Sequence, residues 1–263
     1  MKVVLFCGGR GLRLREYSEA IPKPMVPVGN RPILWHVMRY FAEYGHGDFV
    51  LCLGYRAEVI KEYFLRYNEA VSNDFVLSQG GRSLEFLSTD IEDWRITFAD
   101  TGLAANVGSR LRAVRRHLGD DEMFLANYGD TLTDAPLAPM IEAFERSDAI
   151  AAFLAIRPTY TFHLVDVADD GRVTKLQSVE ESGTRINGGY FIFRRGIFDV
   201  LKEAEELVEA PFHRLMDQGK LMAFTYDGFW APMDTLKDKQ DLDAMWDAGN
   251  PPWAVWRRGD EVP

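Results

Sequence analysis

The sequence contains little cysteine and no long apolar run. Of its 263 residues two are cysteines, Cys7 and Cys52, and both lie in apolar stretches where a buried thiol is the usual state. This disfavours a disulfide scaffold or a cysteine-based metal site. No run of eighteen apolar residues occurs, and the apolar part of the opening MKVVLFCGG is too short for a signal peptide. We therefore expect a cytoplasmic protein that does not enter the membrane.

Positive charge is also in deficit. Lysine and arginine number 30 against 40 acidic residues, which gives a formal net charge of -10. No overall positive field exists to attract nucleic acid or an anionic membrane, so both are excluded as partners. A small phosphorylated ligand is still allowed, because a few local cations and a metal ion can neutralise it.

Short apolar runs alternate with helical patterns in the first part of the chain. Strands are predicted near residues 3–6, 49–53, 95–98, 123–126 and 150–155, and helices near 32–44, 58–67, 108–118 and 137–146. This alternation predicts an α/β fold with a mainly parallel, Rossmann-like sheet flanked by helices on both faces.

The pattern is mixed after residue 157. Strands are predicted near residues 164–167, 173–177, 186–193 and 221–226, with helices near 198–209 and 211–218. The tail from residue 235 begins as a helix and contains Trp246, Trp253 and Trp256. These rings either cover the protein's own core or contact a neighbouring subunit.

A glycine-rich turn with Gly8, Gly9 and Gly11 follows the first strand and Cys7. Missing side chains allow backbone N–H groups to approach a phosphate, and Arg13 adds a charged fork. Such glycines also serve tight strand-to-helix turns with no ligand. The turn alone therefore leaves both interpretations open.

Lys23 stands between two prolines in the sequence Ile21-Pro22-Lys23-Pro24-Met25. This stiff segment holds the ammonium group in a fixed place, which suits a phosphate. A solvated lysine in a proline-rich loop is the alternative. The combination of this lysine with the glycine-rich turn favours phosphate binding.

Two aspartates are candidate metal ligands. Asp130 ends an apolar strand, and ligands of open parallel sheets bind beyond the carboxyl ends of strands. Asp234 lies in Ala231-Pro232-Met233-Asp234, so only the fold can bring the two together. A strand-end aspartate is otherwise a turn or capping residue. Similarly, Asn187-Gly188-Gly189 suits either a sugar-binding loop or an Asn-Gly hairpin turn.

The glycine turn and the Pro-Lys-Pro-Met segment together resemble the opening signature GGxGTRL…PKPM of the sugar-1-phosphate nucleotidyltransferases. Leu12 stands where that family usually has threonine. The resemblance continues nearly end to end, and is strongest to the members that join CTP to glucose 1-phosphate. It is carried by residues 31–36, 54–56, 59–64, 100–102, 128–130, 186–189 and 228–236.

This resemblance implies a GT-A-like fold and a set of site residues. Catalytic roles fall on Lys23, Arg13 and Asp130, and Asp130 and Asp234 are implied to hold Mg²⁺. The implied nucleotide-binding residues are Cys7, Gly8, Gly9, Gly11, Arg13, Lys23, Gly54, Tyr55, Thr101 and Gly129. The implied substrate-binding residues are Arg110, Tyr128, Lys175, Asn187, Gly188 and Gly189.

The implied organisation is a nucleotidyltransferase domain over residues 1–235 and a C-terminal extension over 236–263. The nucleotide-binding half covers about 1–157 and the acceptor-binding half about 158–235. A homo-oligomer is also implied.

The sequence departs from the family at the acceptor side. The family's Glu-Lys-Pro motif, whose lysine is expected to grip the sugar phosphate, is replaced by Gln177-Ser178-Val179-Glu180-Glu181. Lys175 and Arg185 are candidate substitutes, while Arg110 and Arg112 are candidates for the sugar or phosphate.

Three functions therefore remain. The first is transfer of CMP from CTP to α-D-glucose 1-phosphate, giving CDP-glucose and pyrophosphate. The second uses CTP or another triphosphate with a different phosphorylated acceptor, and the third is a noncatalytic nucleotide-binding subunit.

Overall fold

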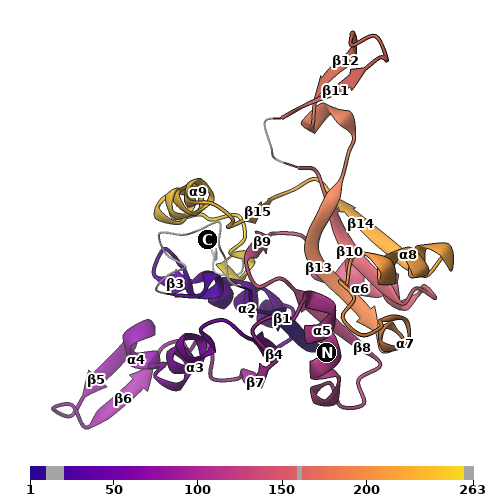
Figure 1. The fold of residues 1–263 in the computed structure, drawn as a ribbon. Coiled ribbons are helices and arrows are strands. Elements are labelled where there is room, and N and C mark those ends of the chain that lie inside the picture. Colours follow the sequence, from indigo (N-terminus) through magenta and orange to yellow (C-terminus); the bar gives the residue numbers. More distant parts are fainter. Residues whose placement is uncertain (10–20, 159–161, 258–263) are drawn as a thin grey trace.

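A seven-stranded sheet forms the centre of the protein, and the computed structural model describes it within residues 1–9, 21–158 and 162–257 (Figure 1). Its strand order is β14-β10-β13-β8-β1-β4-β7. The strands are β1 (Lys2–Phe6), β4 (Asp48–Leu53), β7 (Arg95–Asp100), β8 (Met123–Asn127), β10 (Ala151–Ile156), β13 (Ile186–Arg194) and β14 (Leu221–Tyr226). Strands from both halves of the chain thus share one sheet.

The sheet is mainly parallel, as predicted. Strand β1 runs parallel to β4 and β8, β4 to β7, and β10 to β14, whereas β13 runs antiparallel to both of its neighbours. The carboxyl ends of β1, β4, β7 and β8 therefore lie at one edge, where ligands of such sheets bind.

Helices cover both faces because alternate side chains of the strands point to opposite sides. Val3 and Leu5 of β1 belong to the cluster that includes α2 (Ile33–Glu43), α3 (Ala57–Leu65) and α6 (Leu137–Glu145). Val4 and Phe6 belong to a second cluster on the other face. It includes α5 (Val107–Val114), α7 (Ile197–Val200) and α8 (Ala210–Asp217).

The helix predicted near residues 198–209 is wrong. Helix α7 ends at Val200, and residues 201–209 form an irregular segment before α8. Ala204 has a left-handed backbone (φ 59°), and its carbonyl accepts a hydrogen bond from Asn106 Nδ2 at 2.9 Å. A tertiary contact thus competes with the helical hydrogen bond that the sequence pattern favours.

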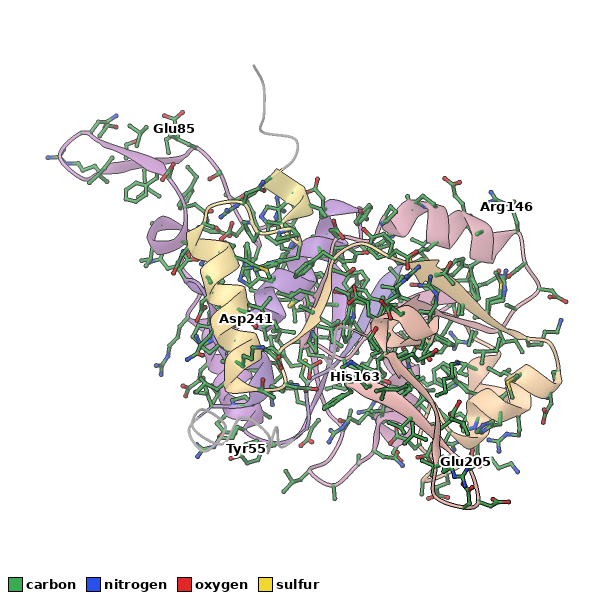
Figure 2. All side chains as sticks on the ribbon, turned by 90° about the horizontal axis from the view of Figure 1, so that it is seen from above. Tyr55, Glu85, Arg146, His163, Glu205 and Asp241 are labelled. Carbon is green, nitrogen blue, oxygen red and sulfur yellow. The ribbon has the colours of Figure 1, made fainter. Side chains whose placement is uncertain are left out.

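Two hairpins project from opposite ends of the molecule (Figure 1). One pairs β5 (Phe75–Ser78) with β6 (Ser83–Phe86), and the other pairs β11 (His163–Val167) with β12 (Val173–Ser178). Figure 2 shows Glu85 of the first hairpin far from the body of the protein. Strands β5 and β6 were not predicted from the sequence.

The remaining elements are short. Two further strand pairs are β2 (Pro27–Val28) with β3 (Arg31–Pro32), and β9 (Thr131–Thr133) with β15 (Trp230–Pro232). The short helices are α4 (Glu69–Ser72), η2 (Lys23–Met25), η3 (Arg115–His117), η4 (Glu180–Ser182) and η5 (Val255–Arg257).

The aromatic tail packs on the protein itself. After α9 (Leu236–Asp247), Trp253 is 1% exposed and its ring contacts His36 of α2 and Phe229. Trp246 and Trp256 also lie against the His36 ring. Within the described residues, no helix combines the length and the apolar character that crossing a bilayer requires.

His36 is buried in the neutral form inside this cluster. Its Nε2–H donates to the Val28 carbonyl at 3.0 Å, and its Nδ1 accepts from Trp253 Nε1–H at 3.3 Å. Burial lowers the pKa of His36 from 6.5 to about 4. Protonation would convert the acceptor nitrogen into a second donor that faces the indole N–H.

We expect the free energy of unfolding to fall as pH decreases from 6.5 to 4. In this range the unfolded chain binds a proton at residue 36 and the folded chain does not, so His36 stabilises the fold above pH 6.5. The loss attributable to His36 is about 3 kcal/mol. Urea unfolding of wild type and His36→Gln across this range measures it; equal pH dependence in both would contradict the assignment.

Candidate active site

Lys23 contacts both predicted metal ligands. Its Nζ donates to Asp130 Oδ2 at 2.6 Å and to Asp234 Oδ1 at 2.5 Å. Asp130 follows β8 and Asp234 follows β15, and β15 pairs with β9 so that Pro232 faces Thr131. The Met233 amide also donates to the Asp130 carbonyl at 3.0 Å. The strand pairing thus brings together two aspartates that are distant in the sequence.

The lysine remains charged in this position. Burial acts to lower the pKa of Lys23, but the charges and hydrogen bonds of Asp130 and Asp234 outweigh it and raise the pKa above its usual value. The ammonium group lies at the convergence of two carboxylates. The two carboxylates stabilise its positive charge.

A buried asparagine fixes the turn that carries Asp130. Asn127 Oδ1 accepts from the Gly129 amide at 2.7 Å, and its Nδ2 donates to Gly189 O and Thr131 Oγ1. Gly129 has φ 78°, a conformation that glycine adopts without steric cost. The predicted nucleotide-binding residue Gly129 therefore serves to turn the chain toward Asp130.

A cavity of about 500 Å³ opens beside the two aspartates. Its lining combines polar and apolar side chains. The lining residues are Phe6, Gly9, Ala105, Asn106, Val107, Arg110, Tyr128, Asp130, Thr131, Ile186, Asn187, Glu206, Trp230, Pro232 and Asp234. The size and the convergent polar groups are typical of a small-molecule site.

Tyr128 and Asn187, both predicted to bind substrate, lie in this cavity. Burial raises the pKa of Tyr128, and the charges of Glu206 and Asp130 raise it further, so its hydroxyl remains protonated. Asn187 Oδ1 accepts from the Gly189 amide at 2.9 Å, which orients the side chain. These groups supply both donors and acceptors for a hydroxylated ligand.

Gly188 and Gly189 are buried and contact protein side chains. The Gly188 carbonyl accepts from Trp230 Nε1 at 2.7 Å, and a Cβ on Gly189 would lie 2.5 Å from the Tyr128 ring. Both residues are inside β13, so the hairpin-turn interpretation of Asn187-Gly188 is wrong. Their small size makes room for Tyr128 and Trp230.

Arg110 lines the cavity but is only 4% exposed. Its guanidinium donates to the carbonyls of Gly8 (3.0 Å) and Leu53 (3.1 Å) and to Thr101 Oγ1 (2.7 Å). Burial lowers the pKa of Arg110. The predicted nucleotide-binding residues Gly8, Gly54 and Thr101 all surround this guanidinium.

Other predicted nucleotide residues differ in their access to the cavity. Gly9 is exposed and lines the cavity. Cys7, by contrast, is fully buried, and its amide donates to the Cys52 carbonyl. Burial raises the pKa of the Cys7 thiol. The amide of Tyr55, labelled in Figure 2, donates to Gly8 O at 3.2 Å. Gly11 and Arg13 lie outside the described residues.

The candidate substitutes for the missing motif lysine lie elsewhere. Lys175 is exposed on β12, opposite Asp166, and does not line the cavity. Arg185 donates to Asp227 and to two backbone carbonyls, while Arg112 is exposed and donates to Leu201 O.

Sequence reasoning missed Asn106, Glu206 and Trp230 as site residues. Asn106 caps α5 by accepting from the Ser109 amide at 2.8 Å, a role that the sequence Asn-Val-Gly-Ser is compatible with. Trp230 lies in the segment 228–236 that carries the resemblance. For Glu206 there was no signal, because the irregular segment that presents it was predicted as a helix.

Comparison with known proteins identifies the family. The nucleotidyl transferase family profile matches residues 2–247. The chain belongs to this family. The glucose-1-phosphate cytidylyltransferase of Salmonella typhi is 38% identical to this nucleotidyl transferase over 258 residues, which cover 97% of this chain and all of the relative. The predicted membership is thereby confirmed.

The comparison extends to a more distant relative and to a solved structure of the same fold. The mannose-1-phosphate guanyltransferase of Yarrowia lipolytica is 26% identical over 90% of this chain and 62% of its own length. Among solved structures, a UDP-glucose pyrophosphorylase complexed with UDP-glucose superposes with a TM-score of 0.68 at 14% identity. The superposition covers 94% of this chain and 98% of the UDP-glucose pyrophosphorylase chain. The predicted α/β nucleotidyltransferase fold is confirmed.

Proposed function

We propose that this nucleotidyl transferase transfers CMP from CTP to α-D-glucose 1-phosphate, giving CDP-glucose and pyrophosphate. The observation that carries the proposal is the convergence of Lys23, Asp130 and Asp234 at the side of a cavity that several polar side chains line. The similarity to the Salmonella cytidylyltransferase supports the choice of nucleotide and sugar.

We further propose that Asp130 and Asp234 hold Mg²⁺. Mg²⁺ usually takes one or two carboxylates from the protein and completes its coordination with water and substrate phosphates. Two carboxylates that converge on one cation fit this donor set. No group of three or more His, Cys, Asp and Glu side chains within the described ranges is placed to hold a metal without such help.

The chemistry requires positioning and charge neutralisation, with no protein nucleophile. An oxygen of the sugar phosphate attacks the α-phosphorus of CTP, and the bond to pyrophosphate breaks. A bound Mg²⁺ supplies Lewis acidity toward the phosphate oxygens. Lys23 is released from the aspartates to stabilise negative charge at the α-phosphate, and Tyr128 and Asn187 bind sugar hydroxyls.

Pyrophosphate release tests the proposal. We expect release with Mg²⁺, CTP and glucose 1-phosphate, and much less with UTP, dTTP, ATP or GTP. A panel of other sugar 1-phosphates and small phosphates runs in parallel. Absence of release with every pair would refute the enzymatic proposal and favour a noncatalytic nucleotide-binding subunit.

A second candidate is a different phosphorylated acceptor. The observation that favours it is the position of Lys175 and Arg185, since neither replaces the motif lysine at the cavity. Glu206 adds a carboxylate to the cavity lining. Release with CTP and another phosphate, but not with glucose 1-phosphate, would select this alternative.

We also propose that the protein is a homo-oligomer that uses the β5–β6 hairpin. Phe75 faces Phe86 and Leu77 faces Leu84, so one face of this projecting ribbon is apolar, and Leu77 is 59% exposed. An isolated two-stranded hairpin is marginally stable in water, and an apolar face of this kind is stabilised by a second copy of the chain.

Replacement of Leu77 by lysine is expected to dissociate the oligomer, because a charge on the apolar face must be desolvated at the interface. Val76→Lys is the matched control, since Val76 faces Glu85 on the opposite side of the same hairpin. Light scattering coupled to size-exclusion chromatography measures the mass. A monomeric wild type, or equal masses for wild type and Leu77→Lys, would refute this use of the hairpin.

A further inference from the structure

Arg110 joins the carboxyl ends of three neighbouring parallel strands. Its guanidinium contacts Gly8 after β1, Leu53 at the end of β4, and Thr101 after β7. Thr101 also donates its hydroxyl to Leu53 O at 2.7 Å. A flat guanidinium with forked donors can satisfy several carbonyls in fixed directions, which an ammonium group does not reproduce.

Gly8 is required by this arrangement. A Cβ at Gly8 would lie 2.0 Å from Arg110 Nη1, whereas a Cβ at Gly9 would have no heavy atom within 4 Å. The two glycines therefore have different roles. The missing side chain of Gly8 makes room for Arg110, and that of Gly9 leaves the cavity open.

The peptide bond between Gly8 and Gly9 links the Arg110 hydrogen bond to the orientation of the Gly9 amide. Gly8 O accepts from Arg110 Nη2 at 3.0 Å and from the Tyr55 amide at 3.2 Å. A trans peptide is planar, and its C=O and N–H point in opposite directions. Holding the Gly8 carbonyl therefore directs the Gly9 N–H away from Arg110, at a residue that lines the cavity.

We infer that Arg110 is a positioning residue, which orients the Gly9 amide so that it donates to the triphosphate of the nucleotide. This inference rests on the proposed function and assigns Arg110 to the nucleotide loop. The family resemblance instead implied a place for Arg110 in the substrate site. Its guanidinium donates to four protein acceptors, the fourth being Leu103 O at 3.5 Å, and the amide that it orients makes the contact with phosphate.

Three variants test the inference: Arg110→Lys, Gly8→Ala and their combination. Arg110→Lys retains the positive charge but loses the forked donors of the guanidinium. Gly8→Ala retains the guanidinium but displaces it from its position. Each single change is expected to lower kcat/KM for CTP about 10- to 100-fold and to weaken CTP·Mg²⁺ binding in calorimetry, with the KM for the sugar phosphate unchanged. The double variant is expected to be little worse than either single one, because both remove the same contact.

Two further variants make the test specific. Thr101→Val keeps the side-chain volume and removes one acceptor of Arg110, so it is expected to shift CTP affinity in the same direction even where Gly8→Ala fails to fold. Arg112→Lys is the matched control. Arg112 lies two residues after Arg110 on the same helix but is exposed, so this variant is expected to have the CTP affinity and kcat/KM of wild type.

The outcomes separate the two proposals. Normal CTP affinity in Arg110→Lys together with a raised KM for the sugar phosphate would overturn the inference alone, since Arg110 would then bind the acceptor directly. Additive losses in the double variant would also overturn it. A wild type that binds no nucleoside triphosphate in calorimetry would overturn the proposed function and this inference with it.

Discussion

Asp130→Asn is expected to lower kcat about 1,000-fold, the scale seen when a preorganised electrostatic contact to the reacting group is lost. Asparagine has nearly the same shape and retains an oxygen that can accept from Lys23. It loses the charge, which both the lysine and a metal ion require. The loss is therefore expected in the chemical step, measured as pyrophosphate release at saturating CTP and sugar phosphate.

Stability separates this effect from damage to the fold. Lys23 keeps Asp234 as a carboxylate partner in this variant, so we expect Asp130→Asn to unfold within about 2 kcal/mol of wild type. Asp134→Asn is the matched control. Asp134 accepts from Tyr226 OH and the Phe229 amide and does not line the cavity, so this variant is expected to retain activity. A kcat within tenfold of wild type for Asp130→Asn would refute the assigned role.

Trp253→Ala is expected to lower the free energy of unfolding by about 3–5 kcal/mol, the usual cost of truncating a large aromatic side chain in a core. Trp253 is 1% exposed, and its ring fills the space between His36 and Phe229. Its removal also leaves His36 Nδ1 without the indole donor. Urea unfolding followed by circular dichroism measures the change.

Two control variants separate the contributions of ring packing and of the hydrogen bond to this loss of stability. Trp253→Phe keeps most of the ring and loses the hydrogen bond to His36, so about 1 kcal/mol is expected. Trp256→Ala removes a half-buried ring of the same tail and is expected to cost less than Trp253→Ala. A loss below about 1 kcal/mol for Trp253→Ala would mean that the tail is dispensable for the core.

The tail also connects to the segment that carries Lys23. The Gly29 amide donates to Asp243 Oδ1 of α9 at 3.0 Å, and a Cβ at Gly29 would lie 2.2 Å from the Trp246 ring. Gly29 turns the chain between β2 and β3, six residues after Lys23. Residues 236–257 thus buttress the segment that presents the lysine.

Local sequence patterns were sufficient for the central sheet. The strands predicted near 3–6, 49–53 and 123–126 agree with β1, β4 and β8 within one or two residues. Burial on both faces requires continuous apolar runs in such strands, and this pattern is visible without tertiary information. The prediction failed at residues 198–209, where a contact from Asn106 to Ala204 outweighs helical propensity.

The sequence by itself determined the family and the α/β class, and it singled out Lys23, Asp130 and Asp234 as candidate site residues. The spacing of the apolar runs indicates the fold, and the short motifs indicate the family and these residues. Only the tertiary structure showed which side chains pack against the glycines. Gly8 and Gly54 adjoin Arg110, and Gly188 and Gly189 adjoin Trp230 and Tyr128. A glycine in the sequence is compatible with steric exclusion of a side chain at that position. It does not identify the neighbouring side chain, because that side chain comes from a distant part of the sequence.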